Sequence, residues 1–278
     1  MSFYSKLSMG LAYAYDWLFS TFWIIESKRN DDKVNVYRNM IWPDISGNVL
    51  ELGPGYAQSL KLLRHTTMKD GSESVDPAFI QAYTVIEPNS FMYGGLQKNA
   101  EDNGFRVKYD TLSYPEGAAV ATMAANDDSI PFVIVKGTLD EFNNIPKAVL
   151  DGAPYDSILT SFSLCTARNP KAALKNIFKL LRPGGTYYFI EHVRQPKAND
   201  PLVIEDNGVN AWFWGKVQDC INPIWKLVGH GCNVNRRTGE IISKMGCWND
   251  IDYKYVRPAI DIQSRVMPLS FGRATKPK

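Results

Sequence analysis

The sequence contains few of the residues that build metal sites and disulfide frameworks. Among its 278 residues are only four cysteines and three histidines, and no Cys-x-x-Cys pair occurs. Structural zinc sites usually take their ligands from such closely spaced pairs, so we expect no bound metal. No signal-peptide pattern is seen, which favours a reducing, cytoplasmic environment in which thiols stay free. The cysteines are Cys165, Cys220, Cys232 and Cys247.

The sequence also has no excess of charge of either sign. It carries 31 basic and 29 acidic residues, for a net charge of +2. Domains that bind nucleic acid present a strongly basic surface, so no nucleic-acid partner is expected. Because 45% of the residues are hydrophobic, the chain can bury a full core, and a small molecule is the favoured ligand.

No apolar run is long and uncharged enough to predict a membrane span. The most aromatic stretch, residues 3–25, carries Asp16 near its centre, whereas a span needs about 20 mostly apolar residues. We expect one or two helices that cap a ligand cleft; the alternative is a helix lying in a membrane interface. A charged break at residues 26–33 and a further helix at 34–41 would complete an N-terminal helical cap over residues 1–43.

The most informative stretch is residues 48–57. Apolar residues at its start predict a short buried strand, and Gly53 and Gly55 follow at a turn where a ligand can approach the backbone closely. A helix-compatible run comes next, and a second strand within residues 83–89 ends at the acid Glu87. Strand, glycine turn, helix and acid-ended strand are typical of a nucleotide-binding crossover, in which the acid binds ribose hydroxyls.

Two features depart from the usual form of that crossover. Ala57 stands where a third glycine is common. Glu87 also follows Gly53 at more than the roughly 20 residues typical of a dinucleotide fingerprint. We interpret residues 66–82 as an inserted loop that accounts for the extra distance.

These motifs resemble those of class I S-adenosylmethionine (SAM) dependent methyltransferases. Glu-Leu-Gly-Pro-Gly at residues 51–55 resembles motif I of that family, Val-Ile-Glu-Pro-Asn at 85–89 its second-strand motif, and Leu-Arg-Pro-Gly-Gly at 181–185 the turn before its fifth strand. Pro-Ile-Trp-Lys at 223–226 and Gly-His-Gly-Cys at 229–232 look like the methyltransferase-like 7 (thiol methyltransferase) subgroup and related small-molecule O-methyltransferases.

The resemblance implies a Rossmann-like α/β fold with a seven-stranded, doubly wound sheet that ends in an antiparallel hairpin. The hairpin is expected from residues 251–256 and 264–271, and the third strand from residues 132–135. Residues 105–131 are loosely patterned, and we interpret them as a second insertion that holds an extra helix. The SAM-binding domain, residues 44–278, would form one compact unit with the helical cap.

The resemblance also implies SAM as the cofactor and suggests roles for individual residues. Glu51 would fix its amino-acid end, Glu87 its ribose and Asp140 its adenine amino group, although Asp140 could instead cap a short helix. The expected cofactor-binding residues are Glu51, Gly53, Gly55, Glu87, Pro88, Asn89, Leu139, Asp140, Ser161 and Phe162.

The acceptor side is indicated by aromatic density and by two histidines. His192 is the first candidate for the general base and His230 the second; the alternative for each is a structural histidine. The aromatic residues favour a lipophilic acceptor. The expected acceptor pocket comprises Tyr15, Leu164, Cys165, Trp212 and Trp225.

The sequence thus predicts an enzyme that transfers the methyl group of SAM to a hydroxyl of an apolar small molecule, of the kind found in secondary metabolism. A thiol acceptor is the alternative within the same fold. Two other classes stay open: an NAD(P)-dependent oxidoreductase that uses the same crossover, and a noncatalytic or pericyclase-like protein that keeps the SAM-binding fold.

Overall fold

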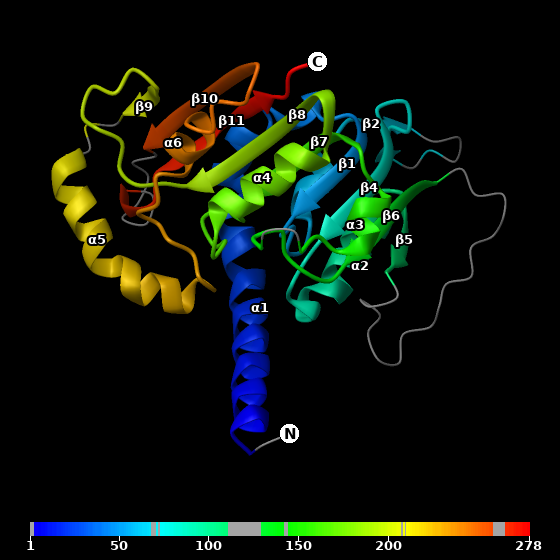
Figure 1. The fold of residues 1–278 in the computed structure, drawn as a ribbon, viewed down its shortest axis with the longest axis horizontal. Coiled ribbons are helices and arrows are strands. Elements are labelled where there is room, and N and C mark those ends of the chain that lie inside the picture. Colours follow the sequence, from blue (N-terminus) through cyan, green and yellow to red (C-terminus); the bar gives the residue numbers. More distant parts are fainter. Residues whose placement is uncertain are drawn as a thin grey trace.

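The computed structural model describes residues 3–67, 71, 73–110, 129–141, 144–206, 208, 210–257 and 265–278. In this part of the chain, a nine-stranded mixed sheet forms the centre of the molecule, in the order β5-β6-β4-β1-β7-β8-β11-β10-β9 (Figure 1). The strands are β1 Gly47–Leu52, β4 Ile80–Ile86, β5 Phe105–Tyr109, β6 Ile130–Val135, β7 Tyr155–Ser161, β8 Leu181–His192, β9 Val203–Asp206, β10 Asp250–Arg257 and β11 Leu269–Thr275.

The seven inner strands confirm the predicted α/β class. Strands β6, β4, β1, β7 and β8 run parallel, and β11 pairs antiparallel with both β8 and β10. The second hairpin strand begins at Leu269, later than the sequence predicted. The central strands are buried on both faces, which is why they consist of nearly continuous apolar runs such as Val49 to Leu52.

The predicted count of seven strands was too low, because each edge carries one more. Strand β5 pairs parallel with β6, and β9 pairs parallel with β10, so the terminal hairpin does not form the edge. The helix expected within residues 105–131 is wrong for residues 105–110, where β5 occupies the start of the segment; residues 111–128 lie outside the described part. Aromatic and β-branched residues in Phe105–Tyr109 favour a strand.

The first crossover also differs from the expected one. Only a five-residue 3₁₀ helix, η2 Gln58–Leu62, follows the glycine turn. It begins after Ala57, whose φ of 51° is unusual for a residue with a side chain. The insertion then forms an antiparallel hairpin of β2 His65–Thr67 and β3 Glu73–Val75. The later helix α2 Tyr93–Asp102 is followed by Gly104 at φ 83°, as the glycine there predicted.

Residues at the N-terminus form a single helix, α1 Phe3–Arg38, which projects beyond the rest of the molecule in Figure 1. The predicted break at residues 26–33 was wrong, because that stretch contains no glycine or proline and its Glu, Lys and Arg residues favour helix. Within the described residues, no helix has both the length and the apolarity that crossing a membrane requires.

Helices cover both faces of the sheet. The C-terminal part of α1 and helix α2 pack on one face through Val34, Tyr37 and Leu96. Helices α3 Lys147–Asp151, α4 Pro170–Leu180 and α6 Thr238–Ser243 pack on the other. Helix α5 Ala211–Val228 instead packs against the loop after β7 and the segment that contains Cys232. This arrangement leaves the carboxyl ends of the central strands facing α1 and the end of α5.

Candidate active site

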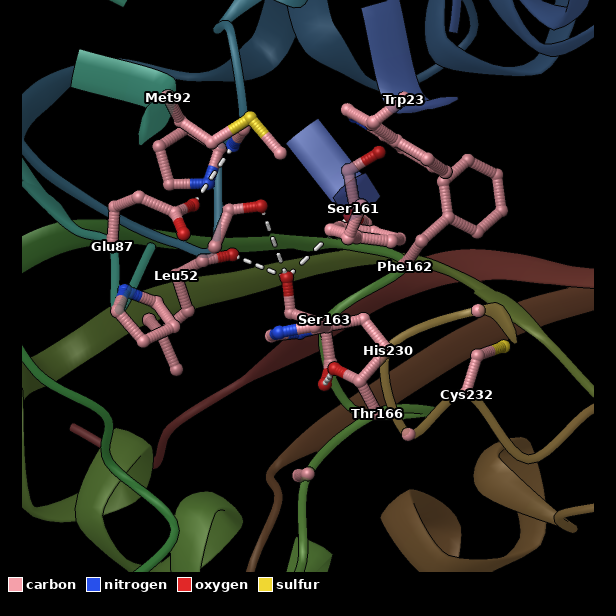
Figure 2. Close-up of a pocket in the computed structure, with 18 of the residues that line it drawn as sticks. Trp23, Leu52, Glu87, Met92, Ser161, Phe162, Ser163, Thr166, His230 and Cys232 are labelled. Atoms are coloured by element: carbon pink, nitrogen blue, oxygen red, sulfur yellow. Dashed lines mark hydrogen bonds between the residues drawn. The ribbon is translucent and has the colours of Figure 1, made fainter. Parts of the chain in front are cut away.

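A cavity of about 870 Å³ lies at the carboxyl ends of β1, β4, β7 and β8. Open α/β sheets bind their ligands at this edge, and the volume is that of a small-molecule or cofactor site. Residues of α1 and of the segment after α5 line the cavity opposite the strands. In Figure 2, Glu87 lies at one side of the cavity, and His230 and Cys232 lie at the other.

The glycine turn after β1 requires glycine for a steric reason. Gly53 has a φ of 59°, and a Cβ added there would lie 2.6 Å from the Ser163 Oγ. That hydroxyl donates a hydrogen bond of 2.5 Å to the Leu52 carbonyl, so it cannot move aside freely (Figure 2). At Gly55, with the same φ, a Cβ would lie 3.0 Å from the Trp23 Nε1 of α1. The turn therefore brings bare backbone to the cavity wall.

Glu87 is held at the end of β4 by the backbone of two loops. Its carboxylate accepts hydrogen bonds from the Gly55 N–H at 3.1 Å and from the Asn89 N–H at 2.9 Å. The residue is only 5% exposed, and burial raises the pKa of its carboxyl to about 7. A carboxylate offers about four lone-pair positions, so the two oxygens can also accept from a pair of vicinal hydroxyls in the cavity.

Glu51 and Arg38 form a buried polar group beside the glycine turn. Glu51 accepts from the Tyr83 Oη at 2.7 Å, and burial raises the pKa of its carboxyl. Arg38 donates through Nη1 to Asp31 at 3.0 Å and through Nη2 to the Ser161 Oγ at 2.8 Å. Arg38 and Asp31 are seven residues apart, two turns of α1 and therefore one helix face. Arg38 and Asp31 were not predicted as site residues, although their seven-residue spacing within a helix indicated that they could pair.

Three residues that line this part of the cavity each carry a buried polar atom with no hydrogen-bond partner among the described residues. These atoms are the Arg38 Nε, the Ser27 Oγ and the Gln58 Oε1. Buried polar groups are nearly always paired, so such a cluster indicates a polar ligand. Together with Glu87, these residues fit SAM: a diol at the carboxylate, and an amino-acid end beside the arginine.

Most of the predicted cofactor-binding residues come together in this cavity. Pro88, Leu139, Ser161 and Phe162 line it together with Glu51, Glu87 and the two glycines. Asp140 lines it too, and accepts from the Thr138 hydroxyl and the Arg168 N–H. Among the described residues it caps no helix, because the next helix there begins only at Lys147.

Asn89 is the exception among the predicted cofactor-binding residues. It does not line the cavity. Its amide donates to the Asp16 carbonyl at 3.0 Å, and its side-chain oxygen accepts from the Phe91 N–H. It therefore ties α1 to the loop after β4.

The predicted acceptor residues separate into two groups. Tyr15, Leu164 and Trp225 line the cavity, whereas Trp212 and Cys165 do not. Trp212 is 74% exposed; it precedes Trp225 by 13 residues, which is about 220° around an α-helix, so the two indoles point to different sides of α5. Cys165 is fully buried behind the cavity wall.

His230 is held at the cavity by contacts with α1. Its Nε2 lies 2.8 Å from the Asp16 Oδ1, and its ring stacks on Tyr15 and Phe19 at centroid distances of 5.1 and 4.6 Å. A carboxylate partner fixes the orientation of an imidazole ring. The helix supplies the partner and both rings, so α1 holds the histidine at the cavity.

His192 lies at the end of β8 in a different environment. Its ring stacks on Phe162 at 4.5 Å, and its Nδ1 lies 3.4 Å from the Cys232 Sγ and 3.9 Å from the Cys165 Sγ. Burial raises the pKa of the Cys165 thiol, whereas contact with Cys165 lowers that of Cys232. Sequence reasoning did not find this group, because the three residues are far apart in the chain.

Fold and site together define the class of a SAM-dependent methyltransferase. A family model described as a methyltransferase domain matches residues 27–224, and the chain therefore belongs to that family. The chain is 32% identical over 95 residues to thiol S-methyltransferase TMT1B of Rattus norvegicus, covering 34% of each protein. It is 28% identical over 130 residues to thiol S-methyltransferase TMT1A of Homo sapiens, covering 46% of each. These matches span less than half the length of either relative.

A solved structure of a SAM-dependent methyltransferase from Thermotoga maritima, described as a possible histamine N-methyltransferase, has the same fold. The TM-score is 0.50 at 14% identity, with 94% of this chain and 99% of that chain covered. The likeness supports the Rossmann-like architecture.

Proposed function

We propose that the protein transfers the methyl group of SAM to the thiol of an apolar small molecule. One observation carries the proposal: a single cavity is lined by the Glu87 carboxylate at one side and by the His230–Asp16 pair at the other. The names of the similar thiol S-methyltransferases favour sulfur over the hydroxyl oxygen that the sequence first suggested.

The cofactor side of the cavity supplies binding. Glu87 would accept from the ribose hydroxyls, and the Arg38 guanidinium would attract the carboxylate of the amino-acid end. Asp140 and Leu139 would receive the adenine. When bound there, SAM supplies an electrophilic methyl group, so no covalent intermediate on the protein is needed.

The acceptor side supplies orientation, proton removal and exclusion of water. Tyr15, Phe19 and Trp225 line an apolar wall that can hold a lipophilic acceptor. Holding the two reactants together can supply roughly 7 to 11 kcal/mol of the barrier. His230 would take the proton of the acceptor thiol, whose ordinary pKa of about 8.5 makes it easier to deprotonate than an alcohol.

A matched pair of acceptors tests this function. The purified protein is incubated with SAM labelled in its methyl group and with either an arylalkyl thiol or the alcohol of the same carbon skeleton. We expect label in the thioether and little in the ether. Labelled ether in place of thioether would instead support the hydroxyl acceptor, and absence of label in either product, with S-adenosylhomocysteine still bound, would support a noncatalytic SAM-binding protein.

A further inference from the structure

We propose that Cys165, Cys232 and His192 bind one zinc ion whose open coordination position faces the cavity. The sequence predicted no metal, because these residues come from the loop after β7, the segment after α5 and the end of β8. In the fold their ligand atoms all lie within 4.8 Å of one another.

The distances among the three ligand atoms match a tetrahedral ion. The two Sγ atoms are 3.4 Å apart, and the His192 Nδ1 is 3.4 Å from the Cys232 Sγ and 3.9 Å from the Cys165 Sγ. A tetrahedral zinc ion with bonds of ~2.3 Å to sulfur and ~2.1 Å to nitrogen separates its sulfur ligands by about 3.8 Å and sulfur from nitrogen by about 3.6 Å. Shifts of a few tenths of an ångström would complete the geometry.

The backbone around the ligands is fixed by buried polar side chains. Glu191 is fully buried and accepts from the Leu164 and Cys165 N–H groups, each at 2.9 Å. The Asn233 N–H donates to the Cys165 carbonyl at 2.9 Å, and its amide donates to the Gly231 carbonyl at 2.8 Å. These bonds hold the segment that carries Cys232 against the loop that carries Cys165. Metal ligands are commonly positioned by such outer interactions.

The position of the three residues leaves one side open. Cys232 and His192 line the cavity, whereas Cys165 lies behind them. An ion held by all three would therefore face the cavity with its fourth position. Zinc sites with three protein ligands and one open position are typically catalytic rather than structural. Thiolate and imidazole ligands select zinc over harder cations, and apolar neighbours such as Val234 and Met267 limit water around it.

This site gives the proposed thiol methylation a means of activating the acceptor, and in this respect it rests on the proposed function. Binding of zinc displaces the protons of both cysteine thiols to solvent. An acceptor thiol that takes the open position loses its proton to His230 and binds as a thiolate, since a coordinated thiol is deprotonated. Its sulfur then forms a bond to the methyl carbon of SAM, while the bond from that carbon to the sulfonium sulfur breaks and its electron pair stays on the departing sulfur.

Cobalt substitution tests the site without any assay of turnover. The full-length protein is stripped with a chelator and titrated with Co²⁺. We expect one ion per chain, with the visible bands of a tetrahedral site and the near-ultraviolet absorption of thiolate–cobalt bonds. Zinc added afterwards should abolish both. Protein purified without chelator should contain about one zinc per chain by elemental analysis.

Variants assign the ligands. Cys165→Ser and Cys232→Ser should each lose the thiolate–cobalt absorption, and His192→Gln should lose tetrahedral binding. Cys220→Ser and Cys247→Ser are matched controls, as is His65→Gln, whose side chain contacts Leu63 and Asn103 instead. All three controls should keep the spectrum of the unaltered protein. Binding of S-adenosylhomocysteine by each variant shows that it is folded.

The outcomes separate this inference from the proposed function. Absence of tetrahedral cobalt in protein that binds S-adenosylhomocysteine and methylates a thiol would overturn the zinc site and leave the function standing. A Cys165–Cys232 disulfide in freshly purified, metal-free protein would also overturn it. Stoichiometric cobalt binding that is lost in Cys165→Ser would support the site even if no thiol is methylated.

Discussion

The two sides of the cavity are built in different ways. The cofactor side depends on short stretches at strand ends: the glycine turn after β1 and Glu87 after β4, joined by the bond from the Gly55 N–H to the Glu87 carboxylate. The acceptor side joins segments far apart in the chain, as in the pairing of Asp16 with His230 over 214 residues. We therefore expect the strand ends to hold the cofactor, and the part of α1 around Asp16, helix α5 and the 229–232 turn to determine the acceptor. A substitution on one side of the cavity should therefore change the function of that side and leave the other unaffected.

The largest effect is expected on the acceptor side, from His230→Ala. Loss of a positioned general base should lower kcat by about 100-fold and leave the affinity for S-adenosylhomocysteine unchanged. Asp16→Asn should lower kcat by a smaller factor, because it removes the negative charge beside His230. Stopped assays with a thiol acceptor and calorimetry with S-adenosylhomocysteine measure the two sides.

An acidic aromatic thiol provides the control for His230→Ala. Such an acceptor is largely ionised at neutral pH and should recover most of the lost rate. A loss of equal size with acidic and ordinary thiols would argue that His230 has only a packing role.

On the cofactor side, Glu87→Gln should weaken the binding of S-adenosylhomocysteine by about 30-fold, since hydrogen bonds to a charged group contribute about 2 kcal/mol. The amide keeps an acceptor for one of the two backbone N–H groups, so the fold should be retained. Glu101→Gln, on the exposed side of α2, is the matched control. Calorimetry that finds the same affinity in Glu87→Gln and the control would remove the ribose assignment.

The raised pKa of Glu87 predicts a pH dependence of cofactor binding. With a pKa of about 7, the carboxyl is mostly protonated at low pH, whereas ribose hydroxyls bind better to the ionised form. Binding therefore releases a proton, and affinity should rise by about tenfold between pH 6 and pH 8 before levelling off. Calorimetry in buffers of different ionisation enthalpy measures the proton. A flat profile in the unaltered protein, or an unchanged slope in Glu87→Gln, would assign the effect to another group.

The smallest expected effect distinguishes Trp225 from Trp212, two of the three tryptophans of α5. Trp225→Ala should raise the KM for a lipophilic thiol about fivefold, corresponding to about 1 kcal/mol of lost apolar contact. Trp212→Ala should change it little, because Trp212 lies outside the cavity. Equal effects on KM from both variants would contradict the placement of the acceptor beside Trp225.

The difference between the cofactor side and the acceptor side also explains which features could be predicted from the sequence. The sequence could place Gly53, Gly55 and Glu87 at the ligand cavity, because their positions follow from neighbours within a strand or turn, where local chain geometry decides the structure. The α/β class of the fold could be predicted from the sequence for the same reason. Strands β5 and β9 were missed, because edge strands are short and depend on the partner strand as much as on their own residues.

Residues on the acceptor side were only partly predictable. His230 was proposed as a base from its residue type, but its partner Asp16 was treated as a charge that interrupts an apolar stretch. On the cofactor side, the pairing of Arg38 with Asp31 was missed because a break at residues 26–33 would separate the two, although charged residues without glycine or proline continue a helix. Cys165, His192 and Cys232 meet only through tertiary packing, which no spacing in the sequence shows.

A crystal structure with S-adenosylhomocysteine bound would test the central claim most directly. We expect both ribose hydroxyls within hydrogen-bond distance of the Glu87 carboxylate and the sulfur atom exposed to the space lined by His230 and Cys232. A ligand bound away from Glu87, or a sulfur atom facing a closed wall on the side of His230, would contradict the account.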